Sequence, residues 1–220
     1  MPDINVPYDF TVGESSLISS KMADADFKHT NWGDEDLLEI RKKIRDHYRT
    51  EQLGVCSFCR NTVSLQSTLN SHVEHIAPKS LYRNFMFEPK NLCVICADCN
   101  AIKRDQEVMQ EMPNTVVNGG SRRLYPRSSN AFKIVHPFFD DYDKHIVQLD
   151  SLYFDLTPKG HFTIGACRLN RFVHQFGWNL ELLDLPEFIN MTQGFLNATD
   201  PRDQRKKLLA IQKIMMRVKI

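Results

Sequence analysis

Four cysteines of the chain form two closely spaced pairs. Two residues separate Cys56 from Cys59, and two separate Cys96 from Cys99. A gap of two residues lets both thiolates of a pair bind one ion from a tight turn, and two such pairs complete a tetrahedral, closed zinc site. We therefore predict a structural Zn²⁺ here. Four unconnected buried cysteines are the plain alternative, and a redox CxxC would explain one pair but not both.

Two further residues, Cys93 and His72, could take part in a metal site, Cys93 with these cysteines and His72 beside Glu74. Cys93 also forms a CxxC spacing with Cys96, although we interpret Cys93 as a small buried residue on a strand. Cys167 lies far along the chain and is expected in the core. His72 would share a strand face with Glu74 and could add a metal ligand, but an ordinary surface role is expected.

Between the cysteine pairs lies a run of residues suited to phosphodiester hydrolysis. An acid and a histidine, Glu74 and His75, stand side by side, and Asn91 and Asn100 follow. A histidine near its normal pKa can take a proton from water at neutral pH. Carboxylate and amide oxygens are hard ligands for Mg²⁺ or Mn²⁺. If residues 72–76 form a strand, Glu74 and His75 point to opposite sides, so one can bind metal while the other addresses the water.

This pattern resembles the HNH endonuclease family, the zinc-stapled ββα-metal nucleases, over roughly residues 50–108. The family has a CxxC, an acid-His-Ile-x-Pro strand, an Asn-Leu, and a CxxC-Asn followed by a lysine. The chain has each element in order, with Glu74 where aspartate is commoner. The resemblance implies that His75 is the general base and that Glu74 and Asn100 bind the catalytic Mg²⁺ or Mn²⁺. It also implies that Asn91 orients the loop carrying the histidine, and that cleavage leaves 5′-phosphate and 3′-hydroxyl ends.

Basic residues flank the motif, although the whole chain has a formal net charge of only +1. Any binding of nucleic acid must therefore rest on local patches. About half of these cations fit an ordinary solvated face. We expect Tyr125 to stack on an unpaired base. The expected contacts to the phosphates of nucleic acid, DNA more than RNA, are Lys79, Lys103, Arg104, Arg122 and Arg123.

Residues 134–171 are similar, more loosely, to the extension that follows the motif in a set of bacterial HNH nucleases. Within that set the chain is most similar to the HNH subunits of Septu-type anti-phage systems, which implies an ATPase protein partner of the SMC/ABC kind. Two other functions stay open. One is a stand-alone restriction or toxin-like HNH nuclease, and the other is a zinc-ribbon binding module without catalysis.

The elements that would position these residues predict an α+β fold in three parts. An extended arm is expected over 1–33, an HNH core with a supporting helix over 34–111, and a mostly helical extension with short strands over 112–220. The supporting helix should begin at Asp34, bury Leu37, Ile40, Ile44 and Tyr48, and end at Gly54. Further expected elements are short strands within 132–165 with turns at 136–137 and 158–160, a helix over 163–185, and a last helix capped at 200–201.

Composition excludes several classes of protein. The chain has 220 residues, of which 42% are hydrophobic and 25% charged, as in ordinary globular chains. No apolar run approaches the ~18 residues of a membrane span, and the first residues lack the pattern of a secretory signal. Six cysteines are too few for a disulfide scaffold, so we expect a reducing cytoplasm. The acidic start and the basic end of the chain are expected either to meet each other or to dock on a partner.

Overall fold

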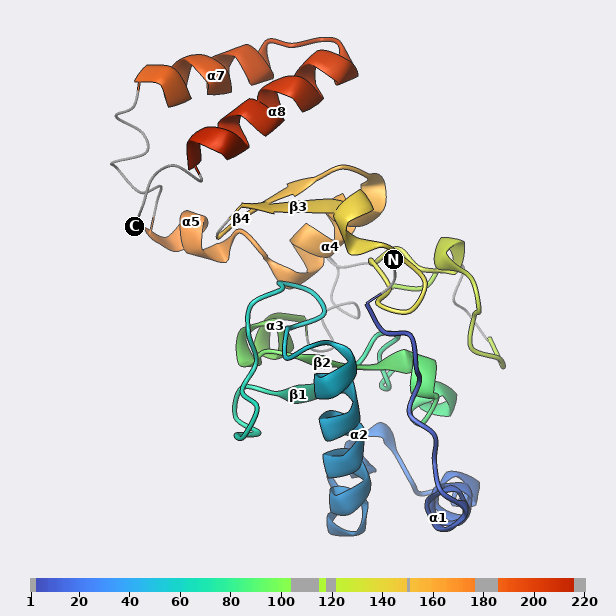
Figure 1. Cartoon of the computed structure of the whole chain (residues 1–220). Coiled ribbons are helices and arrows are strands. Elements are labelled where there is room, and N and C mark those ends of the chain that lie inside the picture. The colour runs from blue at the N-terminus through green and yellow to red at the C-terminus, as the bar shows by residue number, and fades with distance from the viewer. Residues whose placement is uncertain (1–2, 104–114, 118–121, 150, 177–185, 216–220) are drawn as a thin grey trace. The chain divides into compact units, whose positions relative to one another are not determined.

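The structure is a computed structural model that describes residues 3–103, 115–117, 122–149, 151–176 and 186–215 (Figure 1). The described residues form an α+β fold with two small antiparallel sheets of two strands each. The chain divides into two compact units, one of residues 1–147 and 154–169 and one of residues 148–153 and 170–220. The boundary that we expected between residues 111 and 112 falls outside the described residues.

The first part of the chain is not the extended arm that the sequence predicted over residues 1–33. It contains the helix α1 (Val12–Ala23), and Thr11 caps this helix. The Thr11 hydroxyl accepts a hydrogen bond from the Glu14 N–H, while the Glu14 carboxylate accepts one from the Thr11 N–H. This reciprocal capping box satisfies two backbone donors at once, so a helix forms without a strong apolar period.

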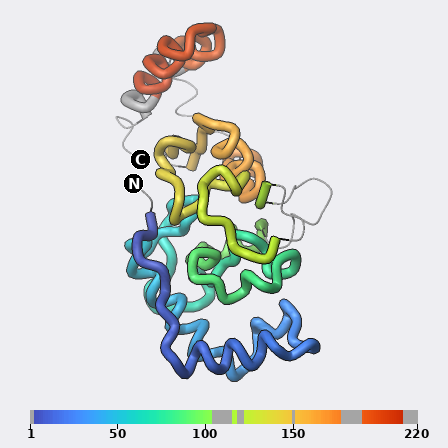
Figure 2. The backbone as a smooth tube through the Cα atoms, turned by 90° about the vertical axis from the view of Figure 1, so that its right-hand side faces the viewer, coloured from blue at the N-terminus to red at the C-terminus, as the bar shows by residue number. Residues whose placement is uncertain are grey.

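The segment before α1 runs antiparallel to the helix α2 (Leu38–Glu51) along the first unit (Figure 2). The Tyr8 N–H donates to the Tyr48 hydroxyl at 3.0 Å, and further on the buried Glu14 pairs with Lys43 at 2.8 Å. At the start of this segment, the N–H groups of residues 3 and 4 both donate to the Pro137 carbonyl, at 3.0 and 3.1 Å. The segment is thereby docked within the chain itself.

The supporting helix α2 buries one face, as predicted. Ile40, Ile44 and Tyr48 are all buried on it at helical spacing. Asp34 precedes the short 3₁₀ helix η2 (Glu35–Leu37) rather than α2 itself. After α2, Gly54 adopts a φ of 73°, a left-handed conformation that glycine tolerates and that ends the helical path.

The strands β1 (His72–His75) and β2 (Leu92–Ile95) form an antiparallel pair in which Glu74 lies opposite Cys93. All four residues of β2 are buried, and α2 packs against both strands. The short helix α3 (Ala97–Lys103) follows β2 directly and contacts β1 (Figure 1). Two strands and a helix therefore stand next to one another around the residues of interest.

The segment from residue 146 to residue 167 departs from its prediction at one turn. The strands β3 (Ile146–Leu149) and β4 (Leu152–Asp155) form the second sheet. Pro158 begins the helix α4 (Pro158–Cys167) instead of a turn, because the Thr157 side chain caps it and proline suits the first helical position. Further short 3₁₀ helices in the described part of the first unit are η1 (His29–Gly33), η3 (Arg83–Phe85), η4 (Pro89–Asn91), η6 (Ser129–Ala131) and η7 (Tyr142–Lys144).

The helix predicted over 163–185 is interrupted. α4 ends where Arg168 takes a left-handed φ of 44°, and α5 (Arg171–Phe176) starts anew; residues 177–185 lie outside the described part.

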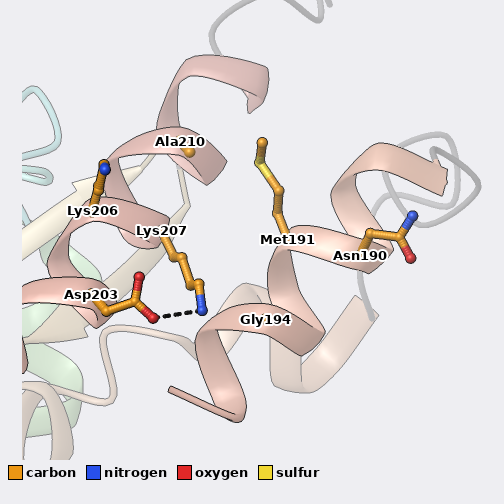
Figure 3. A pocket seen from close by; sticks show the side chains of 7 residues that line it. All are labelled: Asn190, Met191, Gly194, Asp203, Lys206, Lys207 and Ala210. Carbon is orange, nitrogen blue, oxygen red and sulfur yellow. Dashed lines mark ion pairs between the residues drawn. The ribbon is translucent and has the colours of Figure 1, made fainter. Parts of the chain in front are cut away.

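In the second unit, α7 (Pro186–Leu196) and α8 (Pro201–Met215) pack together as a hairpin. The predicted cap of α8 is confirmed, since Asp200 Oδ1 accepts from the Arg202 N–H. A pocket of about 540 Å³ lies between these two helices (Figure 3). Its wall carries the ion pair of Asp203 and Lys207, at 2.7 Å. This pocket brings together none of the predicted site residues.

Candidate functional site

Four cysteine sulfurs lie together where two distant segments of the sequence meet. The sulfur atoms of Cys56, Cys59, Cys96 and Cys99 lie within 4.8 Å of one another, and all four residues are buried. Cys59 Sγ lies 3.6 Å from Cys96 Sγ. Four sulfurs at these distances could hold a metal ion such as zinc. The predicted grouping of the two pairs is confirmed.

Backbone turns aim both sulfurs of each pair the same way. In the first pair, the Arg60 N–H donates to the Cys56 carbonyl, and Arg60 has a φ of 60°. In the second, the Cys99 N–H donates to Cys96 Sγ at 3.4 Å at the start of α3. Burial raises the pKa of the Cys56 thiol well above its ordinary value. A cation among the sulfurs would favour the thiolate that burial alone disfavours.

Cys93, Cys167 and His72 lie outside this group of four sulfurs. Cys93 is buried within β2, and burial raises the pKa of its thiol to about 12, so it behaves as a small core residue. Cys167 is buried at the end of α4. His72 is half-exposed, and its Nε2–H donates to the Leu69 carbonyl at 3.1 Å.

Asn91 is fully buried and closes the loop that follows β1. Its Oδ1 accepts from the Ala77 N–H at 2.7 Å. Its Nδ2 donates to the carbonyls of Ala77 and Phe85, both at 3.0 Å. One amide therefore fixes the backbone two residues beyond His75 to the backbone of η3.

Glu74 points toward α3, where it meets Lys103. The ammonium of Lys103 lies 2.5 Å from Glu74 Oε1 and also donates to the His75 carbonyl at 3.2 Å. Lys103 is only 1% exposed, so the prediction that it contacts nucleic-acid phosphates is wrong. The half-buried Asn100 lies three residues earlier on α3. Positions three apart are neighbours on a helix surface, which places Asn100 on the side of α3 near Glu74.

His75 is buried with 4% of its surface exposed, and its ring makes two defined contacts. The Nε2–H donates to the Met86 carbonyl at 3.1 Å, which leaves the Nδ1 lone pair to accept a proton. The indole ring of Trp32 lies edge-to-face with the imidazole, with 4.6 Å between ring centroids. Burial lowers the pKa of His75 well below its usual 6.5; the charges of Lys79 and Lys103 act the same way, and the hydrogen bond to Met86 opposes them. The imidazole is therefore neutral at pH 7, which is the form a general base requires.

The other predicted basic contacts are spread over the surface. Lys79 is half-exposed within the loop that Asn91 closes. Arg122 and Arg123 are exposed, and the Asn84 side chain donates to both of their carbonyls at 3.1 Å. These three side chains can reach a ligand in solvent. Arg104 lies outside the described residues.

Tyr125 belongs to a second buried polar cluster, so its predicted role of stacking on a base is wrong. It is 6% exposed, and its hydroxyl lies 2.8 Å from Nε2 of the fully buried His136. The Asp140 carboxylate accepts from the His136 N–H at 2.7 Å and from Lys159 Nζ at 2.7 Å, and Ser129 Oγ also donates to it. Every polar group in this cluster has a partner, as buried polar groups require.

Sequence reasoning missed two residues next to the histidine. Trp32 packs on the His75 ring, and Arg83 holds the backbone that leads to Trp32. In the sequence, Arg83 was only one of several basic residues near the motif. Trp32 stands alone in a polar stretch, and nothing in the sequence indicated a role for it.

Comparison of the chain with models of protein families gives no match, and comparison with curated proteins gives no match either. None of the helices in the described part of the chain combines the length and the apolar character that crossing a membrane requires.

Proposed function

We propose that the chain is a metal-dependent endonuclease of the HNH class that hydrolyses phosphodiester bonds in nucleic acid, with DNA the favoured substrate. One observation carries the proposal. Glu74 and His75 are neighbours on β1 and point in different directions. Glu74 faces Lys103 on α3, and the neutral ring of His75 is hydrogen-bonded to the Met86 carbonyl. The buried sulfur cluster holds the start of α3 close to β1.

The residues fit the two kinds of cation that this chemistry needs. Four buried sulfurs suit Zn²⁺ as a structural ion. Glu74 and Asn100 offer oxygen ligands that suit Mg²⁺ or Mn²⁺. Of the two carboxylate oxygens of Glu74, it is Oε1 that forms the ion pair with Lys103. A divalent cation bound there would supply neutralisation of the charge that develops on the phosphate.

The chain's own residues would then act as follows. His75 accepts the proton of the attacking water at Nδ1, while its Nε2–H stays on the Met86 carbonyl. Asn91 does not touch the substrate but holds the loop after His75, so its role is positioning. Lys79, Arg122 and Arg123 contact the phosphate backbone without reading the bases.

The cellular setting follows only from the sequence resemblance. We propose that the nuclease is the effector of a cytoplasmic anti-phage system and acts with a separate ATPase subunit. If the purified chain alone cuts as fast as it does with an ATPase subunit present, a stand-alone restriction or toxin-like nuclease is favoured instead.

Nicking of supercoiled plasmid by the purified full chain in Mg²⁺ or Mn²⁺ tests the activity. His75→Ala should lower the rate by about 10²–10⁴-fold, as loss of a general base does. His72→Ala, on the same strand but with its ring bonded to the Leu69 carbonyl, should cut like the wild type. Both variants should keep their bound zinc. Equal cleavage by His75→Ala and the wild type would end the proposal, and tight binding without any nicking would favour a non-catalytic zinc-ribbon module.

A further inference from the structure

The conformation described here covers the proposed general base. A histidine that takes a proton from water must touch that water and lie near the substrate phosphate. The His75 side chain is only 4% exposed, and the Trp32 ring stands against it at an interplanar angle of 81°. Substrate therefore cannot reach the imidazole while Trp32 stays in place.

We propose that residues 22–34, here called the strap, form an autoinhibitory cover in which Trp32 blocks His75, and that cleavage requires the strap to lift. This inference rests on the proposed function and adds a form of regulation to the same site. The strap runs from the last residues of α1 through η1 to the residue before η2, so a helix adjoins it at each end.

Two arginines outside the strap hold it through its backbone. Arg83 donates from Nε to the Phe27 carbonyl at 2.6 Å and from Nη2 to the carbonyls of Met22 and Asp24, at 3.0 and 2.9 Å. Arg83 stands three residues before Met86, whose carbonyl holds the His75 ring. The same short stretch of chain therefore holds both the base and its cover.

The second arginine holds the other end of the strap. Arg41 on α2 donates to the carbonyls of Trp32, Gly33 and Asp34. These bonds fix the backbone at Trp32, so the position of its ring does not depend on ring contacts alone.

The strap buries few apolar side chains, so most of its attachment comes from the bonds of Arg41 and Arg83. Phe27 is buried against Phe87, and Trp32 packs on Phe87 at 5.4 Å, but Trp32 itself is only half-buried. Most other strap residues are exposed. Segments with few buried apolar contacts open at low free energy.

Charge gives a route by which substrate could lift the strap. Within residues 22–34, Asp24, Asp26 and Asp34 stand against the single Lys28, so the strap has the same sign of charge as nucleic acid. A phosphate group that engaged the Arg83 guanidinium would compete for the donors that now hold three strap carbonyls.

Chemical accessibility of His75 tests the cover without using nuclease activity. The full zinc-loaded chain is treated with diethyl pyrocarbonate, and modification of each histidine is followed by peptide mass spectrometry. Trp32→Ala should raise the modification rate of His75 by about tenfold or more, because the reaction follows the population of the open form. Trp32→Phe keeps an aromatic ring and should stay near the wild-type rate. His161, whose side chain is 80% exposed, serves as the internal reference in every sample.

A second variant covers the case in which Trp32→Ala fails to fold. Arg83→Met removes three bonds to the strap and should also expose His75, with zinc content and circular dichroism as checks on the fold. If either variant folds and its His75 is modified at the wild-type rate, the proposal that the strap covers His75 is wrong.

Plasmid nicking by the same samples separates this inference from the proposed function. Faster nicking by Trp32→Ala than by the wild type supports autoinhibition. If the accessibility of His75 is unchanged and nicking is normal, the proposal of an autoinhibitory strap is wrong and the proposal of nuclease activity stands. If His75 is exposed and no nicking occurs, the proposal of nuclease activity is wrong, and the strap then has no activity to inhibit.

Discussion

Lys103 and Glu74 form an ion pair inside the protein, with 2.5 Å between Nζ and Oε1. Their side chains are 1% and 10% exposed, so neither charge is well solvated if its partner is removed. Lys103→Met should therefore lower the free energy of unfolding by about 3–5 kcal/mol, as removal of one member of a buried pair does. Urea unfolding monitored by circular dichroism measures the change.

Two further variants check this prediction. Lys144→Met breaks an ion pair with Asp141 whose lysine side chain is 78% exposed, and should cost less than about 1 kcal/mol. Adding Glu74→Gln to Lys103→Met should restore part of the lost stability, because no uncompensated charge then remains. A single Lys103→Met variant as stable as the wild type would show that the pair is not buried in solution.

The amide of Asn91 offers a test that depends on chemistry rather than size. Asn91→Asp keeps the shape of the side chain but removes the Nδ2 donor, so the Ala77 and Phe85 carbonyls each lose one hydrogen bond and face a carboxylate. We expect a loss of at least about 2 kcal/mol of unfolding free energy, given ~1–3 kcal/mol for each buried unsatisfied group. Asn130→Asp, at an exposed position in η6, should change stability by less than about 0.5 kcal/mol.

The sulfur cluster predicts a stoichiometry of bound metal. The purified chain should contain one zinc ion per molecule by inductively coupled plasma mass spectrometry. Cys59→Ser and Cys96→Ser should each lose most of it and unfold at lower temperature. Cys93→Ser is the matched control, since Cys93 is equally buried but lies outside the cluster. Zinc retained in both cluster variants would refute a shared site.

His136 predicts a pH dependence of stability with a definite sign. Burial lowers the pKa of His136 from 6.5 to about 3. Between these values the unfolded chain binds a proton at this residue and the folded chain does not. The stabilisation from keeping His136 neutral is therefore full above pH 6.5 and is lost as the pH falls toward 3, by up to about 1.4 kcal/mol per pH unit.

A variant isolates this contribution from that of the other titrating groups. His136→Gln should show a shallower fall in unfolding free energy between about pH 6.5 and pH 4.5 than the wild type. His161→Gln, at an exposed side chain, should leave the slope unchanged. Parallel curves for the wild type and His136→Gln would mean that His136 is protonated in the folded chain.

Local spacing was enough to predict the cysteine cluster and the buried face of α2. Cys56 and Cys59 lie within one turn of the backbone, and the apolar residues of α2 repeat at 3.6-residue intervals, so neighbouring residues determine both. Alternation along β1 likewise predicts opposite sides for Glu74 and His75, and their different partners agree with it.

Partners far along the chain decided what the sequence could not show. Lys103 looked like a surface cation, but its place on α3 aims it at Glu74, 29 residues earlier. Tyr125 looked free to stack, but it is buried and its hydroxyl lies 2.8 Å from Nε2 of the buried His136. Pro158 signalled a turn, and only the Thr157 cap makes it the first residue of a helix.

The attachment of residues 3 and 4 to the Pro137 carbonyl has a consequence for biosynthesis. During translation the start of the chain leaves the ribosome long before residue 137, so Ile4, only 1% exposed in the finished protein, must wait without its binding partner. Closing so long a loop is entropically expensive and slow relative to local helix formation. The Ile4 side chain therefore stays without its native contacts until the segment around Pro137 has been synthesised.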